Sequence, residues 1–178
     1  MISPTDLRPL HDAEAISQAV GRVADAIAQE LQGRGPVFLA GIPTRGAVLA
    51  QRLENLLRAR GVDCGCGTVD ISMHRDDLGL RGGLVELKGT TLPVDLENWN
   101  VVLVDDVQQT GRTARAAIEA VLAFGRPKRI LYAVLADRGG RELPVRPDFT
   151  GLVLSVPASA RVRVRLAGAD EGEEGIFA

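Results

Sequence analysis

Short apolar runs alternate with amphipathic helical segments along this chain, and this alternation constrains the fold more than any other feature. Apolar residues recur every three to four positions from 12 to 31, which predicts a helix. The continuous apolar run 36–42 then predicts a strand covered on both faces. A turn at 43–46 and a second helical stripe, which ends at Gly61, follow.

The same pattern continues in the second half of the chain. The predicted elements there are a strand at 62–73, a buried strand at 101–104, a helix at 112–124, a strand at 129–136, and late strands at 152–156 and 162–166. Helices alternating with apolar strands predict an α/β fold with a mostly parallel sheet flanked by helices. Ligands of such folds bind beyond the carboxyl ends of the strands.

Length and composition exclude several classes of protein. A chain of 178 residues favours one domain spanning 1–178. The net charge of -2 excludes a strongly basic coat for nucleic acid, although a local basic patch stays open. The apolar runs are far shorter than the roughly 20 residues of a membrane helix. The start of the chain lacks the pattern of a secretory signal, so we expect a cytoplasmic protein.

The two cysteines, Cys64 and Cys66, are too close in sequence for a framework disulfide and have no second ligand pair at zinc spacing. We therefore predict buried small residues rather than a metal site.

Two segments interrupt the pattern. Residues 74–93 contain four glycines and a charge cluster, which predicts a long mobile loop that serves as a lid, with a small hairpin as the alternative. Residues 168–178 are acidic and rich in glycine, which predicts a frayed tail.

The segment 101–113 carries the chemistry. Four apolar residues place Asp105 and Asp106 at the carboxyl end of a buried strand, where adjacent acids are costly unless something binds them. The Thr-Gly-Arg-Thr sequence that follows lies at a helix N-terminus, where hydroxyls, a permissive glycine and backbone N–H groups form an anion cradle. Together they suit a ribose 5-phosphate. The alternative is that the acids cap the strand and Thr110 caps the helix.

This sequence resembles the type I phosphoribosyltransferases, whose signature is an apolar strand, two acids and a Thr-Gly loop. Within them it is most similar to the PyrR family, pyrimidine operon attenuation regulators that also have uracil phosphoribosyltransferase activity. The resemblance extends from the first helix to Ser159 and rests on Thr44-Arg45-Gly46 and on residues 70–78, 104–107, 110–113 and 137–144. It implies the type I phosphoribosyltransferase fold with a mobile loop and a small hood.

The resemblance also implies a reaction, in which uracil and 5-phosphoribosyl 1-diphosphate give UMP and pyrophosphate with Mg²⁺. It further implies regulation of pyr operon transcription through the leader mRNA in response to uridine nucleotides, and a homodimer or homotetramer. Breaking the anomeric C–O bond develops positive charge on the ribose and negative charge on the pyrophosphate. Catalysis then depends on electrostatic placement, without a covalent nucleophile.

Each motif receives a role in this reaction. Asp105 and Asp106 would hold the ribose hydroxyls and, directly or through water, Mg²⁺. Arg45 would meet the pyrophosphate, and Arg75, in the predicted lid, would close over it, with a solvated charge cluster as the alternative for Arg75. The residues that would hold the 5-phosphate are Thr110, Gly111, Arg112 and Thr113. The turn that contains Arg45, and that would bind the pyrophosphate, consists of Thr44, Arg45 and Gly46. Arg138 would lie beside the base or pair with Glu142.

The RNA-binding function is the part of the resemblance with the most departures. The family carries other residues where this chain has Gly21, Asp25, His74, Gln108-Gln109, Gly140 and Leu152. Histidine, threonine and lysine at four of these positions belong to the face that contacts messenger RNA in the family. Three candidate RNA contacts remain, namely Arg22, Arg141 and Arg146. The losses predict weakened attraction to RNA phosphates.

Three functions stay open at this point. The first is an enzyme that makes UMP, with or without regulation. The second is an RNA-binding attenuator in which catalysis is secondary. The third is a phosphoribosyltransferase for another base, because base specificity depends on a hood that sequence identifies poorly.

Overall fold

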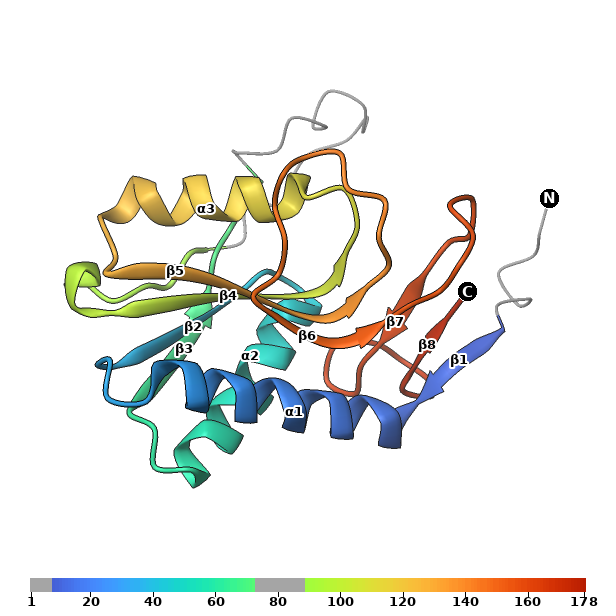
Figure 1. Ribbon diagram of the computed structural model, residues 1–178, viewed down its shortest axis with the longest axis horizontal. Helices are drawn as coiled ribbons and strands as arrows, with labels where there is room; N and C mark the ends of the chain where they lie inside the picture. The colour runs from blue at the N-terminus through green and yellow to red at the C-terminus, as the bar shows by residue number, and fades with distance from the viewer. Residues whose placement is uncertain (1–7, 73–88) are drawn as a thin grey trace.

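The computed structural model describes residues 8–72 and 89–178, and a parallel sheet forms its centre (Figure 1). The strand order is β3-β2-β4-β5-β6, and every neighbouring pair is parallel. The five strands are β2 (Val37–Gly41), β3 (Cys64–Thr68), β4 (Asn100–Gln108), β5 (Arg129–Asp137) and β6 (Phe149–Val153). The predicted α/β fold with a mostly parallel sheet is confirmed.

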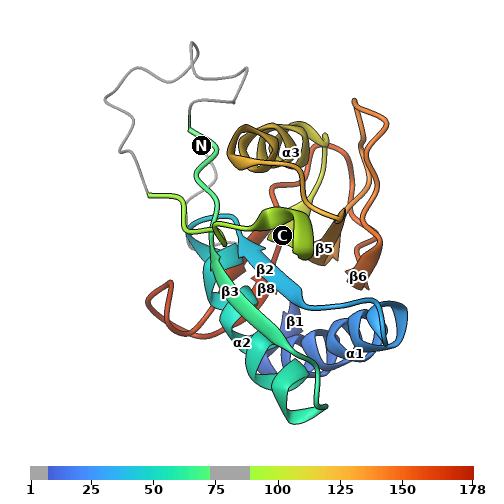
Figure 2. The same ribbon diagram turned by 90° about the vertical axis from the view of Figure 1, so that its left-hand side faces the viewer.

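Helices cover both faces of this sheet. Helices α1 (Ala13–Leu31) and α2 (Arg45–Ala59) pack on one face, and α3 (Arg112–Phe124) packs on the other (Figures 1 and 2). All five residues of β2 are buried as a result. This two-sided burial explains why the strand appears in the sequence as a continuous apolar run. A short 3-10 turn, η2 (Leu96–Asn98), precedes β4.

A second sheet of three antiparallel strands lies beside the end of the parallel sheet, in the order β1-β8-β7 (Figure 1). Its strands are β1 (Pro9–Asp12), β7 (Arg163–Arg165) and β8 (Gly175–Phe177). The prediction of a frayed tail at 168–178 is therefore wrong. Strand β8 pairs on both sides, and Ile176 is fully buried.

Several element boundaries differ from the sequence prediction. Helix α2 begins at Arg45, inside the predicted turn 43–46, with Thr44 as its N-cap. Strand β4 continues to Gln108, so both acids lie within its carboxyl-terminal part rather than after it. The late strand predicted at 152–156 lies at Phe149–Val153. These shifts are small because the apolar patterns locate the elements well and their ends less well.

Residues 74–88 of the predicted loop 74–93, Arg75 among them, lie outside the described residues. Its last residues run beside the end of β3, where the Thr91 backbone N–H donates to the Thr68 carbonyl at 2.8 Å. Within the described residues, no helix combines the length and the apolar character needed to cross a membrane.

Candidate active site

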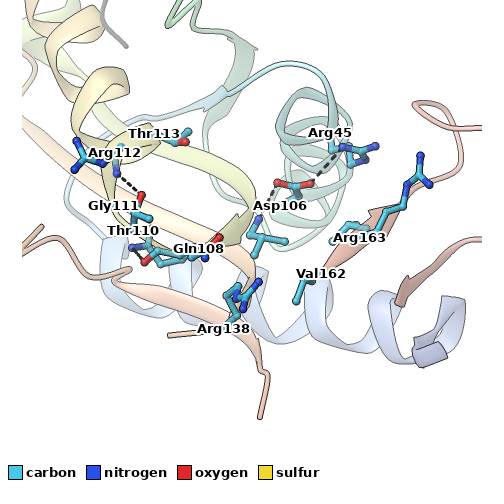
Figure 3. Close-up of a pocket in the computed structure, with 13 residues that line it drawn as sticks. Arg45, Asp106, Gln108, Thr110, Gly111, Arg112, Thr113, Arg138, Val162 and Arg163 are labelled. Atoms are coloured by element: carbon cyan, nitrogen blue, oxygen red, sulfur yellow. Dashed lines mark hydrogen bonds and ion pairs between the residues drawn. The ribbon is translucent and has the colours of Figure 1, made fainter. Parts of the chain in front are cut away.

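A pocket of about 500 Å³ opens at the carboxyl ends of β4 and β5 (Figure 3). The start of α3 and strand β7 complete its wall. The lining residues are Arg45, Asp106, Val107, Gln108, Gln109, Thr110, Gly111, Arg112, Thr113, Arg138, Val162, Arg163 and Val164. Seven of the predicted site residues therefore meet in one cavity, in the position expected for ligands of a parallel α/β sheet.

The two adjacent acids have different surroundings. Asp105 is buried, and its Oδ1 accepts the Asp106 backbone N–H at 2.8 Å. Asp106 lines the pocket, and its Oδ1 accepts the Val107 N–H at 2.8 Å. Its Oδ2 lies 3.7 Å from Nη1 of Arg45 (Figure 3). Asp106 is therefore the acid placed to meet a ligand, whereas Asp105 lies behind it.

The predicted anion cradle has the expected backbone. Helix α3 begins at Arg112, and Gly111 is its N-cap with φ +91°, a left-handed conformation that favours glycine. The hydroxyl of Thr110 accepts the Arg112 N–H at 3.3 Å. The backbone N–H groups of the first helical turn point toward the N-terminus of α3, which lines the pocket. The helix dipole favours an anion at that end. The predicted helix start is confirmed, and anion binding there stays a prediction.

The segment after β5 folds over this loop. The backbone N–H groups of Glu142 and Leu143 both donate to the Thr110 carbonyl at 3.0 Å. Nη2 of Arg112 forms an ion pair with Glu142 at 2.8 Å. Arg138 therefore does not have Glu142 as its partner, and that alternative from the sequence is wrong.

Arg138 lines the pocket but its guanidinium holds the chain that leads to β7. Its Nη1 donates to the Ala160 carbonyl at 2.8 Å, and its Nη2 donates to the carbonyls of Pro157 and Ala158 at 3.2 Å. One side chain thus donates hydrogen bonds to three carbonyl oxygens. Arg138 shapes the wall of the pocket through this loop, as well as facing the cavity itself (Figure 3).

Gln108 is a site residue whose role the sequence did not reveal. It is 2 % exposed, and its Oε1 accepts the hydroxyl of Tyr132 at 3.1 Å. Its Nε2 donates to the carbonyl of Gln109 at 3.3 Å. Burial raises the pKa of the Tyr132 hydroxyl, and the nearby acids Asp105 and Asp106 raise it further. Gln108 therefore ties the end of β4 to β5 beneath the pocket, as a neutral partner for a protonated tyrosine.

Arg45 reaches the pocket from the start of α2. Besides Asp106 it contacts Asp170, which accepts from its Nε at 2.8 Å and from its Nη2 at 2.7 Å. The hydrogen bond to Asp170 raises the pKa of Arg45, and the same bond lowers the pKa of Asp170. Thr44 and Gly46 flank Arg45 but do not line the cavity, and neither does Asp105.

The candidate RNA contacts lie on separate elements. Arg22, on α1, donates to the Gly151 carbonyl of β6 at 3.0 Å. Arg141 forms an ion pair with Asp137, and Arg146 is exposed on the segment that leads to β6. Asp25 forms an ion pair at 2.7 Å with Arg60, the C-cap residue of α2. Two of the three arginines are thus engaged within the chain.

The prediction that the two cysteines are buried small residues is confirmed for Cys64 and only in part for Cys66. Cys64 is buried and Cys66 is half-buried, and Sγ of Cys66 lies 3.0 Å from Oε2 of Glu54. Burial, together with that carboxylate, raises the pKa of Cys66 to about 12. Across the described part of the chain, no group of three or more His, Cys, Asp or Glu side chains could hold a metal ion. Both thiols are therefore protonated packing residues at neutral pH.

Comparison with known proteins defines the class. The chain belongs to the phosphoribosyl transferase domain family, whose model matches residues 7–164. The crystal structure of the hypoxanthine phosphoribosyltransferase of Trypanosoma cruzi has a TM-score of 0.74 at 21% identity, covering 96% of this chain and 94% of that chain. That likeness shows a shared fold, and the predicted type I phosphoribosyltransferase fold is confirmed.

More similar relatives narrow the family. Bifunctional protein PyrR of Roseiflexus sp. (strain RS-1) is 46% identical over 170 residues, covering 93% of this chain and 91% of that protein. Bifunctional protein PyrR of Listeria monocytogenes serotype 4a (strain HCC23) is 43% identical, covering 93% of each. Within its class the chain belongs to the PyrR family. The resemblance found in the sequence is confirmed, and with it the expectation of a phosphoribosyltransferase enzyme.

Proposed function

We propose that residues 1–178 form one phosphoribosyltransferase-like domain that converts uracil and 5-phosphoribosyl 1-diphosphate into UMP and pyrophosphate. The observation that carries this proposal is that Arg45, Asp106, Arg138 and the loop 110–113 line the same pocket. 5-Phosphoribosyl 1-diphosphate carries phosphate groups at both ends of a ribose. The pocket offers it anion-binding groups for the two ends and a carboxylate for the ribose between them. Membership of the PyrR family supports uracil as the base.

Each group of residues binds a different part of the substrate. The N-terminus of α3 holds the 5-phosphate through backbone N–H groups and the Thr110 and Thr113 hydroxyls. Asp106 accepts the ribose hydroxyls and stabilises the positive charge that develops on the ribose ring. Arg45 takes up the negative charge that develops on the departing pyrophosphate. Arg75 keeps the proposed role of closing over that group.

The chemistry of the two acids fits Mg²⁺. Carboxylate oxygens are ligands that Mg²⁺ prefers, and it keeps few of them when phosphate oxygens and water supply the rest. Asp106 would hold the ion from the pocket wall, with Asp105 acting through water. When bound, the ion would neutralise charge on the pyrophosphate.

A substrate panel tests the choice of base. We expect turnover with uracil to exceed turnover with hypoxanthine, guanine and orotate by at least about 10²-fold, because a site built to hydrogen-bond one base leaves its polar groups unpaired with another. The assay follows pyrophosphate release with each base at equal concentration, with Mg²⁺ present. A preference for hypoxanthine or guanine would favour the alternative of another base and overturn the uracil assignment.

We further propose that the protein regulates pyr transcription through leader mRNA, with diminished RNA affinity. Arg146 is exposed on the segment that leads to β6, whereas Arg141 is paired with Asp137 and Asp25 brings negative charge to α1. The pair of Asp25 with Arg60 offsets part of that repulsion.

We expect the leader hairpin to bind weakly at moderate salt, with a dissociation constant nearer the micromolar than the nanomolar range, because phosphate contacts dominate such affinity. Gel shift of the hairpin with and without UMP measures the affinity, and Arg146→Ala serves as a variant whose arginine has no ion-pair partner among residues 8–72 and 89–178. Tight binding that UMP strengthens and that Arg141→Ala abolishes would contradict the expected weakness.

We also propose a cytoplasmic location and assembly as a homodimer or homotetramer. Both rest on the sequence and on the family.

A further inference from the structure

Two carboxylates between β7 and β8 each accept two hydrogen bonds from an arginine of α2, Asp170 from the side edge of a guanidinium and Glu174 from its end. Asp170 accepts from Nε and Nη2 of Arg45 at 2.8 and 2.7 Å. Glu174 accepts from Nη1 and Nη2 of Arg52 at 2.8 and 2.7 Å. Such two-bond pairs fix the plane of a guanidinium as well as its position. The three-stranded sheet is thus joined to α2 at two points.

The supports of the two carboxylates are also alike. Oδ2 of Asp170 accepts the Leu166 N–H at 3.0 Å, and Oε2 of Glu174 accepts the Ala167 N–H at 2.7 Å. The side chain of Asp170 is 19% exposed and that of Glu174 is 13% exposed. Each carboxylate is therefore oriented by a backbone N–H in addition to its arginine.

Only one of the two arginines reaches the candidate active site. Arg45 lines the pocket and points its Nη1 toward Asp106 at 3.7 Å (Figure 3). Arg52 does not line that pocket and lies instead beside the groove between α1 and α2. Because Asp170 occupies the Nε and Nη2 edge of Arg45, the Nη1 donors remain on the pocket side.

We propose that Asp170 is a positioning residue for pyrophosphate, which holds one edge of the Arg45 guanidinium so that the other edge meets that group of the substrate. This inference rests on the proposed function, because it assumes that Arg45 receives the pyrophosphate. An arginine held in place loses little rotamer freedom when its ligand binds. Without Asp170, the Nε and Nη2 edge of Arg45 loses its partner, so the guanidinium is free to rotate and its orientation toward the pyrophosphate is no longer fixed.

The substitution Asp170→Asn tests the proposal, with Glu174→Gln as its matched control. Both changes remove one charge from a carboxylate that accepts two hydrogen bonds from an arginine of α2 and one from a backbone N–H, so their effects on thermal stability should be similar. Asp170→Asn is expected to raise the KM for 5-phosphoribosyl 1-diphosphate about tenfold and to leave the KM for uracil within about twofold, whereas Glu174→Gln changes neither. Asp170→Glu should restore part of the loss.

Two further measurements separate this proposal from the proposed function. In an Arg45→Ala background, Asp170→Asn should cause no additional rise in KM, because the group that it positions is gone. Titration calorimetry with inorganic pyrophosphate and Mg²⁺ does not depend on the identity of the base, and Asp170→Asn should weaken that binding about tenfold relative to Glu174→Gln. A protein inactive with uracil that still shows this difference would overturn the proposed function alone. Equal pyrophosphate affinity in the two variants, tighter binding in Asp170→Asn, or no pyrophosphate binding by the unsubstituted protein would overturn the positioning role.

Discussion

Replacing Asp106 with asparagine is expected to lower the turnover of phosphoribosyl transfer by roughly 10²–10³-fold, the size of effect seen when a preorganised charge-stabilising group is removed. The carboxylate of Asp106 faces the pocket, and Oδ1 accepts the Val107 N–H. Asparagine keeps that acceptor and the side-chain volume. The loss of charge is therefore the main change, and it falls where positive charge develops on the ribose in the transition state.

The measurement is kcat at saturating uracil and 5-phosphoribosyl 1-diphosphate, with thermal melting to show that the fold is intact. Glu119→Gln is a suitable control, because it removes the same charge from an exposed ion pair with Arg115 on α3, outside the pocket. Its turnover should match that of the unsubstituted protein. Unchanged turnover in Asp106→Asn would contradict the assignment of Asp106 to the reaction.

The parts of this site that sequence predicted are those encoded by local patterns. The apolar run 101–104 identifies a buried strand because both faces of the sheet are covered, and the two acids after that run lie in the carboxyl-terminal part of the strand. The Thr-Gly sequence identifies the start of α3 because a left-handed residue at the N-cap suits glycine. Each signal spans only a few residues, so no knowledge of the tertiary fold is needed to find it.

The parts that sequence missed are contacts between distant segments. Asp170 and Arg45 are 125 residues apart, and nothing in an acidic, glycine-rich stretch indicates which cation it meets. The stretch was predicted to be frayed from its acidic, glycine-rich composition, although two of its carboxylates pair with arginines of α2 and β8 is paired on both sides. The role of Gln108 could not be predicted from sequence either, because it depends on a hydrogen bond with the Tyr132 hydroxyl of the neighbouring strand. The excess of arginines over acidic residues on α2 was the sequence signal that could have indicated acidic partners elsewhere in the chain.

Replacing Gly46 with alanine is expected to destabilise the protein by about 3 kcal/mol, at the upper end of the cost of overpacking. Gly46 was predicted to bind substrate, but in the structure it is where α2 packs against β4. A Cβ at this position would lie 2.3 Å from the Val104 carbonyl oxygen and 3.4 Å from the Cα of Asp105. The same oxygen accepts the Ile42 N–H at 2.9 Å, so moving it away also strains a buried hydrogen bond.

Thermal or urea unfolding measures this change, and Gly21→Ala is the matched control. Gly21 lies inside α1, where an added Cβ would meet nothing within 4 Å. The same substitution there should stabilise the protein by roughly 0.5–1 kcal/mol, because alanine has the higher helix propensity. Opposite signs for one chemical change would locate the cost in the contact of α2 with β4. A Gly46→Ala variant as stable as the unsubstituted protein would show that the start of α2 can move away from β4, and Arg45 would then move with it.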